Sequence, residues 1–203
     1  MTRFLSRAAL AAACASLALA ACNQTPEEPA APPTPTLHEV MKDQIDFNAD
    51  ALWDVTNLAI ANDASLDPAK LDDAKWAQIV DLSGKVEAGA RALAAMDPIV
   101  VAAPGVKIAD SDIEDGHTAA QVQGFVDADP ATLRNLATTL GDHMQALTVA
   151  ARAKDTDTVA RLVNELDGVC ETCHLSYWYP EQAELVRSIR AAGGDDPVSD
   201  EGK

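Results

Sequence analysis

The stretch Cys170-Glu171-Thr172-Cys173-His174 decides how the rest of this 203-residue sequence is interpreted. Two thiols three positions apart can each add to one vinyl group of a haem, and the histidine beside the second thiol is then held against one face of the iron. The spacing is therefore that of c-type haem attachment. We expect one covalently attached haem c, with Cys170 and Cys173 as attachment points and His174 as the proximal iron ligand.

Two other interpretations of the Cys-x-x-Cys pair are weaker. A thioredoxin-like redox pair requires a βαβ setting, whereas the residues around Cys170 have the apolar spacing of a helix. A zinc site would need a second pair of ligands at similar spacing, and the other two cysteines, Cys14 and Cys22, lie near the N-terminus. Haem attachment is therefore the favoured interpretation.

The N-terminal residues have the composition of an export signal. Arg3 and Arg7 precede an apolar run that is shorter than the roughly twenty residues needed to span a bilayer. The run ends in Leu19-Ala20-Ala21-Cys22, which resembles the lipobox of bacterial lipoproteins. We expect removal of residues 1–21, lipidation of Cys22, and anchoring of the protein on the periplasmic side of a bacterial membrane. An ordinary secretory signal that leaves Cys22 as a free thiol is the alternative.

Composition divides the rest of the chain into three segments. Residues 22–36 hold five prolines and little that is apolar, so we expect an extended tether of about 3 Å per residue behind the lipidated Cys22. Residues 37–192 are long enough to form one domain with a real core. Residues 193–203 form an acidic tail that we expect to be disordered.

The charge balance excludes one class of partner. Without Arg3 and Arg7, 13 Lys and Arg residues stand against 32 Asp and Glu residues, a formal charge of −19. Nucleic acid is therefore not an expected partner, whereas a redox protein with a basic docking surface is. Solubility alone would also account for so acidic a surface, and the composition is compatible with a homodimer.

Apolar periodicity predicts that residues 37–192 are helical. Thr36 and Glu39 have the spacing of a capping box before a first helix that should end near Asn62. The further expected helices run from Asp67-Pro68 to about Met96, over 118–128, from Asp129-Pro130 to Ala151, from Asp155 or Thr156 to Pro180, and over 181–191.

Short turns between these helices predict an all-α, antiparallel, up-down-up-down four-helix bundle that binds one c-type haem. In this topology the end of the last long helix lies beside the start of the first. At about 1.5 Å per residue, Met41 and His174 then lie in nearly the same layer. We therefore expect the Met41 thioether to be the second axial ligand, with a core position for Met41 as the alternative.

The segment from Leu37 to Trp178 resembles the class II cytochromes c, the cytochrome c-prime family. The resemblance rests on the stretch from Cys170 to Tyr177 and on Met41. It implies a four-helix bundle in which a methionine in the first helix gives six-coordinate, low-spin haem and electron transfer. An apolar residue there would imply a five-coordinate iron that binds a gas. The family often has arginine where this chain has Trp178, and the connection between its second and third long helices is shorter.

These patterns together predict an exported cytochrome that transfers single electrons and is not an enzyme, because no carboxylate pair, serine triad or phosphate loop stands out. The alternative is a five-coordinate haem protein that binds nitric oxide or carbon monoxide. Among other candidate ligands, we interpret Met96 as core, His38 as a solvated residue at a helix start, and His117 as a reserve ligand in a loop. His143 is expected to lie too far along the third long helix to reach the iron.

Overall fold

Helices make up most of the structure, which is a computed structural model that describes residues 35–61, 65–114 and 116–192. The expected leader, Cys22, most of the tether and the acidic tail lie outside these residues. Apart from an isolated bridge between Ile60 and Leu66, the described residues contain no β structure. The expectation of an all-α domain is therefore confirmed.

The first long helical segment has three parts in direct succession: α1 (Leu37–Val40), the π-helix η1 (Met41–Asp46) and α2 (Phe47–Asn57). Its start is the expected capping box. The Glu39 backbone N–H donates to the Thr36 hydroxyl, and the Thr36 backbone N–H donates to the Glu39 carboxylate at 2.7 Å. The hydrogen bonds that the Thr36 backbone N–H and the Thr36 hydroxyl donate to the Glu39 carboxylate hold the pKa of Glu39 below its usual range.

The connection to the second long helix differs from the sequence expectation at both ends. The first segment ends at Asn57 rather than near Asn62. A single 3-10 turn, η2 (Pro68–Lys70), stands where the next helix was expected to begin. Leu71 leaves helical geometry with φ −107° and ψ 89°. The helix starts only after Asp72, whose side chain accepts a hydrogen bond as the N-cap.

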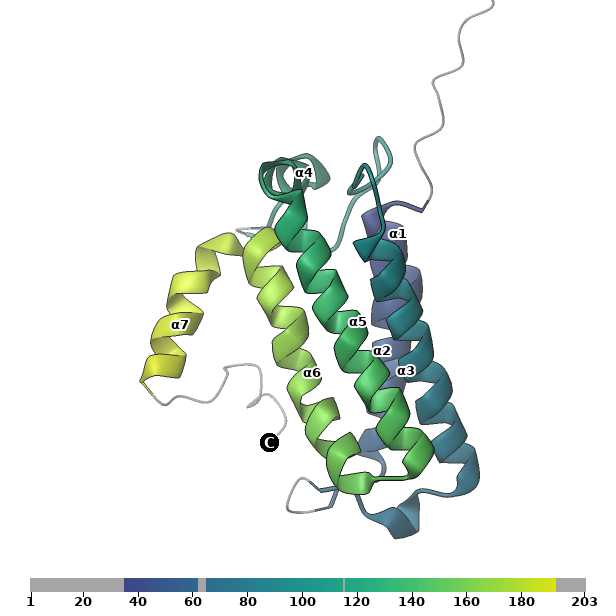
Figure 1. Ribbon diagram of the computed structural model, residues 1–203. Coiled ribbons are helices and arrows are strands. Elements are labelled where there is room, and N and C mark those ends of the chain that lie inside the picture. Colours follow the sequence, from purple (N-terminus) through teal and green to yellow (C-terminus); the bar gives the residue numbers. More distant parts are fainter. Residues whose placement is uncertain (1–34, 62–64, 115, 193–203) are drawn as a thin grey trace, which may run out of the picture. The chain divides into compact units, whose positions relative to one another are not determined.

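The remaining elements are α3 (Asp73–Ala94), α4 (Ala119–Ala128), α5 (Pro130–Ala153), α6 (Thr156–Tyr177), the 3-10 turn η3 (Pro180–Gln182) and α7 (Ala183–Ala191). Asp129 and Asp155 cap α5 and α6 as expected. The segment α1–α2 and helices α3, α5 and α6 lie side by side, with α4 at one end and α7 beside α6 (Figure 1). The end of α6 and the start of the first segment are therefore at the same end of the domain.

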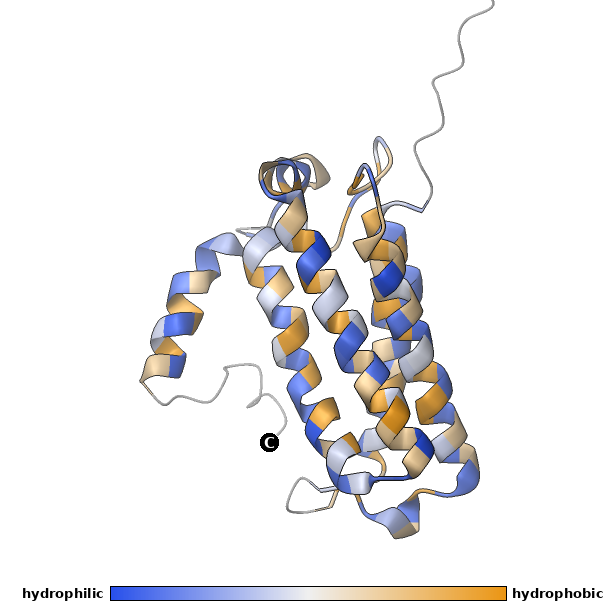
Figure 2. Cartoon of the chain, viewed as in Figure 1, coloured by the Kyte–Doolittle hydropathy of each residue, from blue (hydrophilic) through white to orange (hydrophobic). Residues whose placement is uncertain are grey.

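Apolar side chains form stripes along the helices, with polar residues between them (Figure 2). Trp76 and Met144 are buried, whereas Trp53 and Met96, the latter interpreted above as core, are partly buried against the core. The largest fully buried side chains are those of Ile45, Leu52, Ile79, Leu133, Met144, Leu147 and Leu166. No buried side-chain nitrogen or oxygen of the described residues lacks a hydrogen-bond partner.

Gly89 allows α3 to approach the π-helix closely. A Cβ atom on Gly89 would lie 3.0 Å from Cγ1 of Ile45 and 3.1 Å from Cβ of Gln44. The buried side chain of Asn48 donates a hydrogen bond to the backbone carbonyl of Gln44, one turn earlier, at 2.7 Å. The position of η1 therefore depends on the absence of a side chain at Gly89.

We expect Gly89→Val to destabilise the domain by about 1–3 kcal/mol, because the added side chain must displace Ile45 or the π-helix. Gly84→Val is the matched control in the same helix, since no atom lies within 4 Å of a Cβ at Gly84. Its expected effect is within about 0.5 kcal/mol of zero. Urea denaturation followed by circular dichroism measures both, and equal destabilisation by the two variants would contradict the role given to Gly89.

Candidate haem site

The stretch Cys170–His174 lies in the last turns of α6, at the end of an apolar stripe. The stripe consists of the buried residues Val159, Leu162, Val163 and Leu166. Helical spacing continues it through Cys170 and Cys173, and both cysteines are half-buried against the core. The two thiols therefore lie on the inner side of α6, on the same side as each other, which is what attachment of one group to both requires.

Both thiols are free, and their surroundings favour the protonated form. Burial raises the pKa of Cys170 to about 12, with further contributions from the negative charges of Asp167 and Asp46. Burial raises the pKa of Cys173 to about 11. Because the thiolate is the reactive species, neither thiol reacts readily in the folded chain without haem.

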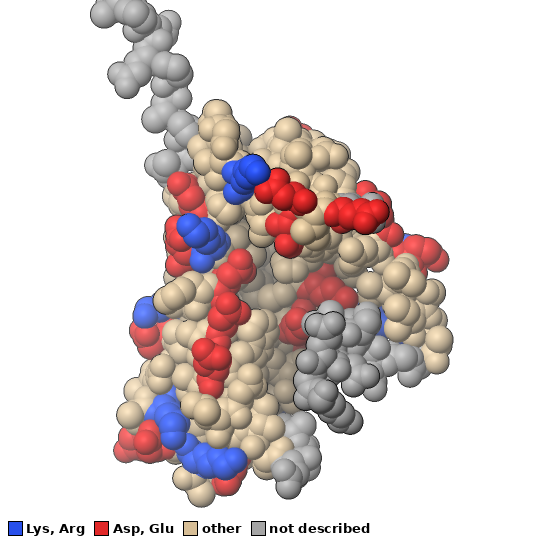
Figure 3. Space-filling view, turned by 180° about the vertical axis from the view of Figure 1, so that it is seen from behind, with Lys and Arg blue, Asp and Glu red and all other residues tan. Residues whose placement is uncertain are grey.

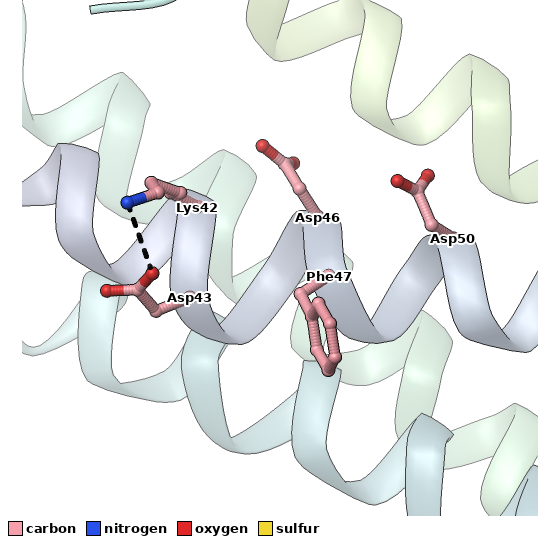
Figure 4. Close-up of a pocket in the computed structure, with 5 residues that line it drawn as sticks. All are labelled: Lys42, Asp43, Asp46, Phe47 and Asp50. Atoms are coloured by element: carbon pink, nitrogen blue, oxygen red, sulfur yellow. Dashed lines mark ion pairs between the residues drawn. The ribbon is translucent and has the colours of Figure 1, made fainter.

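His174 is half-buried and lies within electrostatic range of Asp46, the last residue of η1. Burial raises the pKa of Asp46, and the positive charge that His174 can carry opposes this rise. Asp46 also acts on Cys170. Asp46 and Asp50 point from the first helical segment toward α6 (Figure 4). The structure therefore brings the end of α6 close to the π-helix.

An open hollow of about 490 Å³ lies along this segment, and its lining residues are Lys42, Asp43, Asp46, Phe47 and Asp50. Seen from behind, acidic side chains form a column over η1 and α2, beside a depression in the surface (Figure 3). Helical spacing places Trp53, which is half-buried, on the same side of the segment as Asp46 and Asp50. The hollow therefore has acidic groups at its edge and an aromatic residue further along the same side.

Met41 is the first residue of η1, and its side chain is half-buried against the core. Hydrogen bonds in a π-helix join residues five apart, so Met41 stands one turn before Asp46, the residue in range of His174. Met41 is thus in the helix and at the end of the domain where a second ligand was expected. Its role as a ligand stays a prediction. His38, in the turn before, is half-buried rather than solvated as expected.

The other two histidines are held by hydrogen bonds. His143 Nε2 lies 2.8 Å from a backbone carbonyl of α6, that of Leu162. His117 is buried, with Nδ1 2.9 Å from the Trp178 carbonyl oxygen and Nε2 3.1 Å from the Glu181 carboxylate. The expected reserve ligand therefore has both ring nitrogens engaged, and it ties the loop before α4 to the segment that follows α6.

The aromatic residues after the motif connect the end of α6 to its neighbours. Tyr177 is buried, and its hydroxyl donates to the Asp129 carbonyl at 2.7 Å, at the start of α5. The hydroxyl of Tyr179 donates to the carboxylate of Asp110 in the long loop between α3 and α4. Trp178 packs half-buried against the core. These contacts fix the position of the helix end that carries the motif.

Two features of the site were missed at the sequence level. The nearness of Asp46 to His174 was not predicted, although Asp46 follows Met41 by about one turn. Glu171, which stands between the two cysteines, forms an ion pair with Arg190 of α7. The apolar spacing of 181–191 predicted this helix but could not indicate which surface it packs on. Helix α7 is thus a structural neighbour of the motif.

No family model, curated protein sequence or solved structure matches this chain. Within the described ranges, no three His, Cys, Asp or Glu side chains are grouped as a metal site, and no helix is long and apolar enough to cross a membrane. The candidate site therefore rests on the placement of its own residues. Two free thiols on one side of α6, followed by a half-buried histidine, fit the covalent attachment of one haem.

Alkylation of the haem-free protein tests the state of the thiols. Relative to an ordinary cysteine, the raised pKa values lower the thiolate fraction at pH 8 by about 100-fold for Cys173 and about 1000-fold for Cys170. We expect iodoacetamide to label both far more slowly in the folded chain than in urea, as measured residue by residue with mass spectrometry. Similar rates in both states would contradict the burial of these thiols.

Asp167→Asn separates burial from charge in the same experiment. Asp167 raises the pKa of Cys170 but does not contribute to that of Cys173. Removal of its charge should therefore increase the labelling rate of Cys170 and leave that of Cys173 unchanged, since a lower pKa means more thiolate at a given pH.

Proposed function

We propose that this chain is an exported c-type cytochrome with one haem that transfers single electrons, similar to the class II cytochromes c, and that it is not an enzyme. Residues 37–192 then form an antiparallel up-down-up-down four-helix bundle around this haem. The observation that carries the proposal is the pair of free thiols, Cys170 and Cys173, on the inner side of α6 with His174 directly after them. This end of α6 lies next to the π-helix and its open hollow.

Each residue of the site has a role in this proposal. Cys170 and Cys173 hold the haem through thioether bonds, and His174 ligates one face of the iron. Bound haem supplies an iron that alternates between the ferric and ferrous states. Met41 would hold the iron as its second protein ligand, and its thioether would favour the ferrous state and so raise the reduction potential. The buried apolar side chains around the thiols keep water from that side of the helix.

The N-terminal sequence supports a membrane location for this function. Lipidation at Cys22 anchors the protein on the periplasmic side of a bacterial membrane, and the proline-rich residues 22–36 separate the domain from the surface. The excess of acidic residues favours a basic redox protein as the partner. Nucleic acid is not a partner of the protein in this proposed function.

Covalent haem retention is the first test. Expressed together with a c-type maturation system, the protein should keep its haem on a denaturing gel, as detected by peroxidase staining. Cys170→Ser/Cys173→Ser should lose all covalently held haem, because no other thiol of the domain can form the thioethers. Cys22→Ser, which also removes one thiol, is the control. This variant should keep the haem stain, and it should be found in the soluble fraction instead of the membrane fraction. A colourless wild-type protein would contradict the proposal.

Carbon monoxide tests the ligation by Met41. The reduced wild-type protein should have sharp low-spin bands that carbon monoxide does not change, because both axial positions are filled. Met41→Ala should open one position, give a high-spin spectrum that responds to carbon monoxide, and lower the reduction potential.

Met96→Ala is the matched control, since Met96 is also a partly buried methionine and is interpreted as core. It should leave the spectrum unchanged. If the wild-type iron binds carbon monoxide readily, Met41 is not a ligand, and binding of a small gas such as nitric oxide or carbon monoxide becomes the better function for the same site.

A further inference from the structure

We propose that the outer side of η1 and α2 is the docking surface for a cationic redox protein. This inference rests on the proposed function, because it names the part of the surface through which electrons pass to a partner. The surface is called the acidic stripe here, and its residues are Asp43, Phe47, Asp50, Asp54 and Leu58.

The acidic stripe is an unpartnered helix face. Its residues recur at steps of three or four, so they follow one broad face of the segment, with Asp50 at the edge toward α6 and Phe47 at the edge away from it (Figure 4), and all of them are exposed. Phe47 is 69% exposed and Leu58 is 72% exposed, although both are large apolar side chains. Apolar area of this kind leaves water only when another surface covers it. The stripe thus has two apolar groups available for a contact between proteins.

The charge of the stripe determines which partner it fits. Lys42 is the one basic residue from position 42 to position 54, and its Nζ lies 3.8 Å from Oδ1 of Asp43. With Asp46 included, four aspartates stand against one lysine in this segment, a formal charge of −3. In the described part of the chain, no Lys or Arg forms an ion pair with Asp46, Asp50 or Asp54. These carboxylates are therefore available to a cationic partner.

The position of the stripe agrees with transfer of electrons to and from the site. Asp46 and Asp50 point toward α6, whereas Phe47 projects on the other side of the segment (Figure 4). All three line the hollow of about 490 Å³, and Asp46 is in electrostatic range of His174. A protein that covers Phe47 therefore lies over the residue next to Asp46, which is in electrostatic range of the histidine proposed to hold the iron.

A second copy of this chain is a poor occupant of the stripe. The chain carries a formal charge of −17, so two copies repel each other. Most Lys and Arg side chains of the described residues already pair with acids of their own chain, including Lys85, Arg134 and Arg161. Among the described residues, Lys70, Lys75 and Arg152 are the basic side chains that form no ion pair with an acid, and they are too few to offset the net charge of a second copy. A separate basic protein has the cations to meet the carboxylates.

The arrangement also has the composition of a transient interface. An aromatic residue near the centre with charged groups around it is typical of protein–protein contacts, in which the aromatic ring supplies affinity. Lysine or arginine side chains of a partner can pack on the face of Phe47 while they neutralise the neighbouring aspartates. Complementary charge at the edge mainly increases the association rate and makes it dependent on salt.

Binding to mitochondrial cytochrome c, a basic redox protein used as the probe, tests the docking surface. Full-length protein with its haem is titrated with the probe at low ionic strength, and the dissociation constant is measured by calorimetry. Asp43→Asn/Asp50→Asn/Asp54→Asn should weaken binding about tenfold or more and reduce the dependence on salt. Phe47→Ser should weaken binding about fivefold without changing the salt dependence.

The control is Asp81→Asn/Asp142→Asn/Asp157→Asn, which removes the same number of charges from exposed positions on α3, α5 and α6. It should change the dissociation constant less than about twofold. Equal losses in the two triple variants would show that only net charge matters and would overturn the proposal. The absence of binding would also overturn the proposal. A wild-type dimer in sedimentation experiments that Phe47→Ser converts to monomer would overturn it as well, because a second copy would then occupy the stripe.

This experiment is independent of the spectroscopic tests. Binding is measured without electron transfer, so loss of affinity in the stripe variants with an unchanged absorption spectrum supports the surface by itself. If the protein binds the probe through the stripe but holds no haem, the electron-carrier proposal is contradicted and the docking surface is still supported.

Discussion

The structure depends on the apolar stripe of α6 and on its burial against the other helices. Because an α-helix has a fixed period, the side chains that follow Leu166 along the stripe are those of the two cysteines. Packing of the stripe therefore determines which way both thiols face. Tyr177 completes this arrangement, since it is buried and its hydroxyl donates to the start of α5. The motif is thus held by the core of the domain rather than by a loop.

Burial and charge act in the same direction on the two thiols. Removal from water raises the pKa of both, and the carboxylates of Asp46 and Asp167 add to this for Cys170. Both cysteines are therefore free thiols that stay largely protonated and react slowly in the folded chain. In contrast, Asp46 remains exposed, and the effect of its partial burial on its pKa is opposed by the charge that nearby His174 can carry. One end of the domain thus combines apolar packing with carboxylates at the rim.

The segment after α6 adds contacts to the motif that a minimal bundle would lack. The ion pair of Arg190 with Glu171 links α7 to α6 beside the two cysteines. Buried His117 joins the loop before α4 to this segment through Trp178 and Glu181. The end of α6 is therefore held from the inside by core packing and from the outside by polar contacts.

Local sequence determined the helices with strong caps and long apolar repeats. The capping box at Thr36, the Asp129 and Asp155 caps, and the apolar repeat of α6 all lie where the sequence predicted them, because hydrogen bonds at helix ends and helical periodicity depend on residues close in the chain. The candidate motif itself is local for the same reason.

Only the tertiary structure decided the π-helix at 41–46, the nearness of Asp46 to His174, and the contacts of both ring nitrogens of His117. Each of these depends on a neighbour far away in sequence. Gly89 illustrates the difference: the sequence shows a glycine within a helix, but the contact with Ile45 that requires it exists only after two helices have packed.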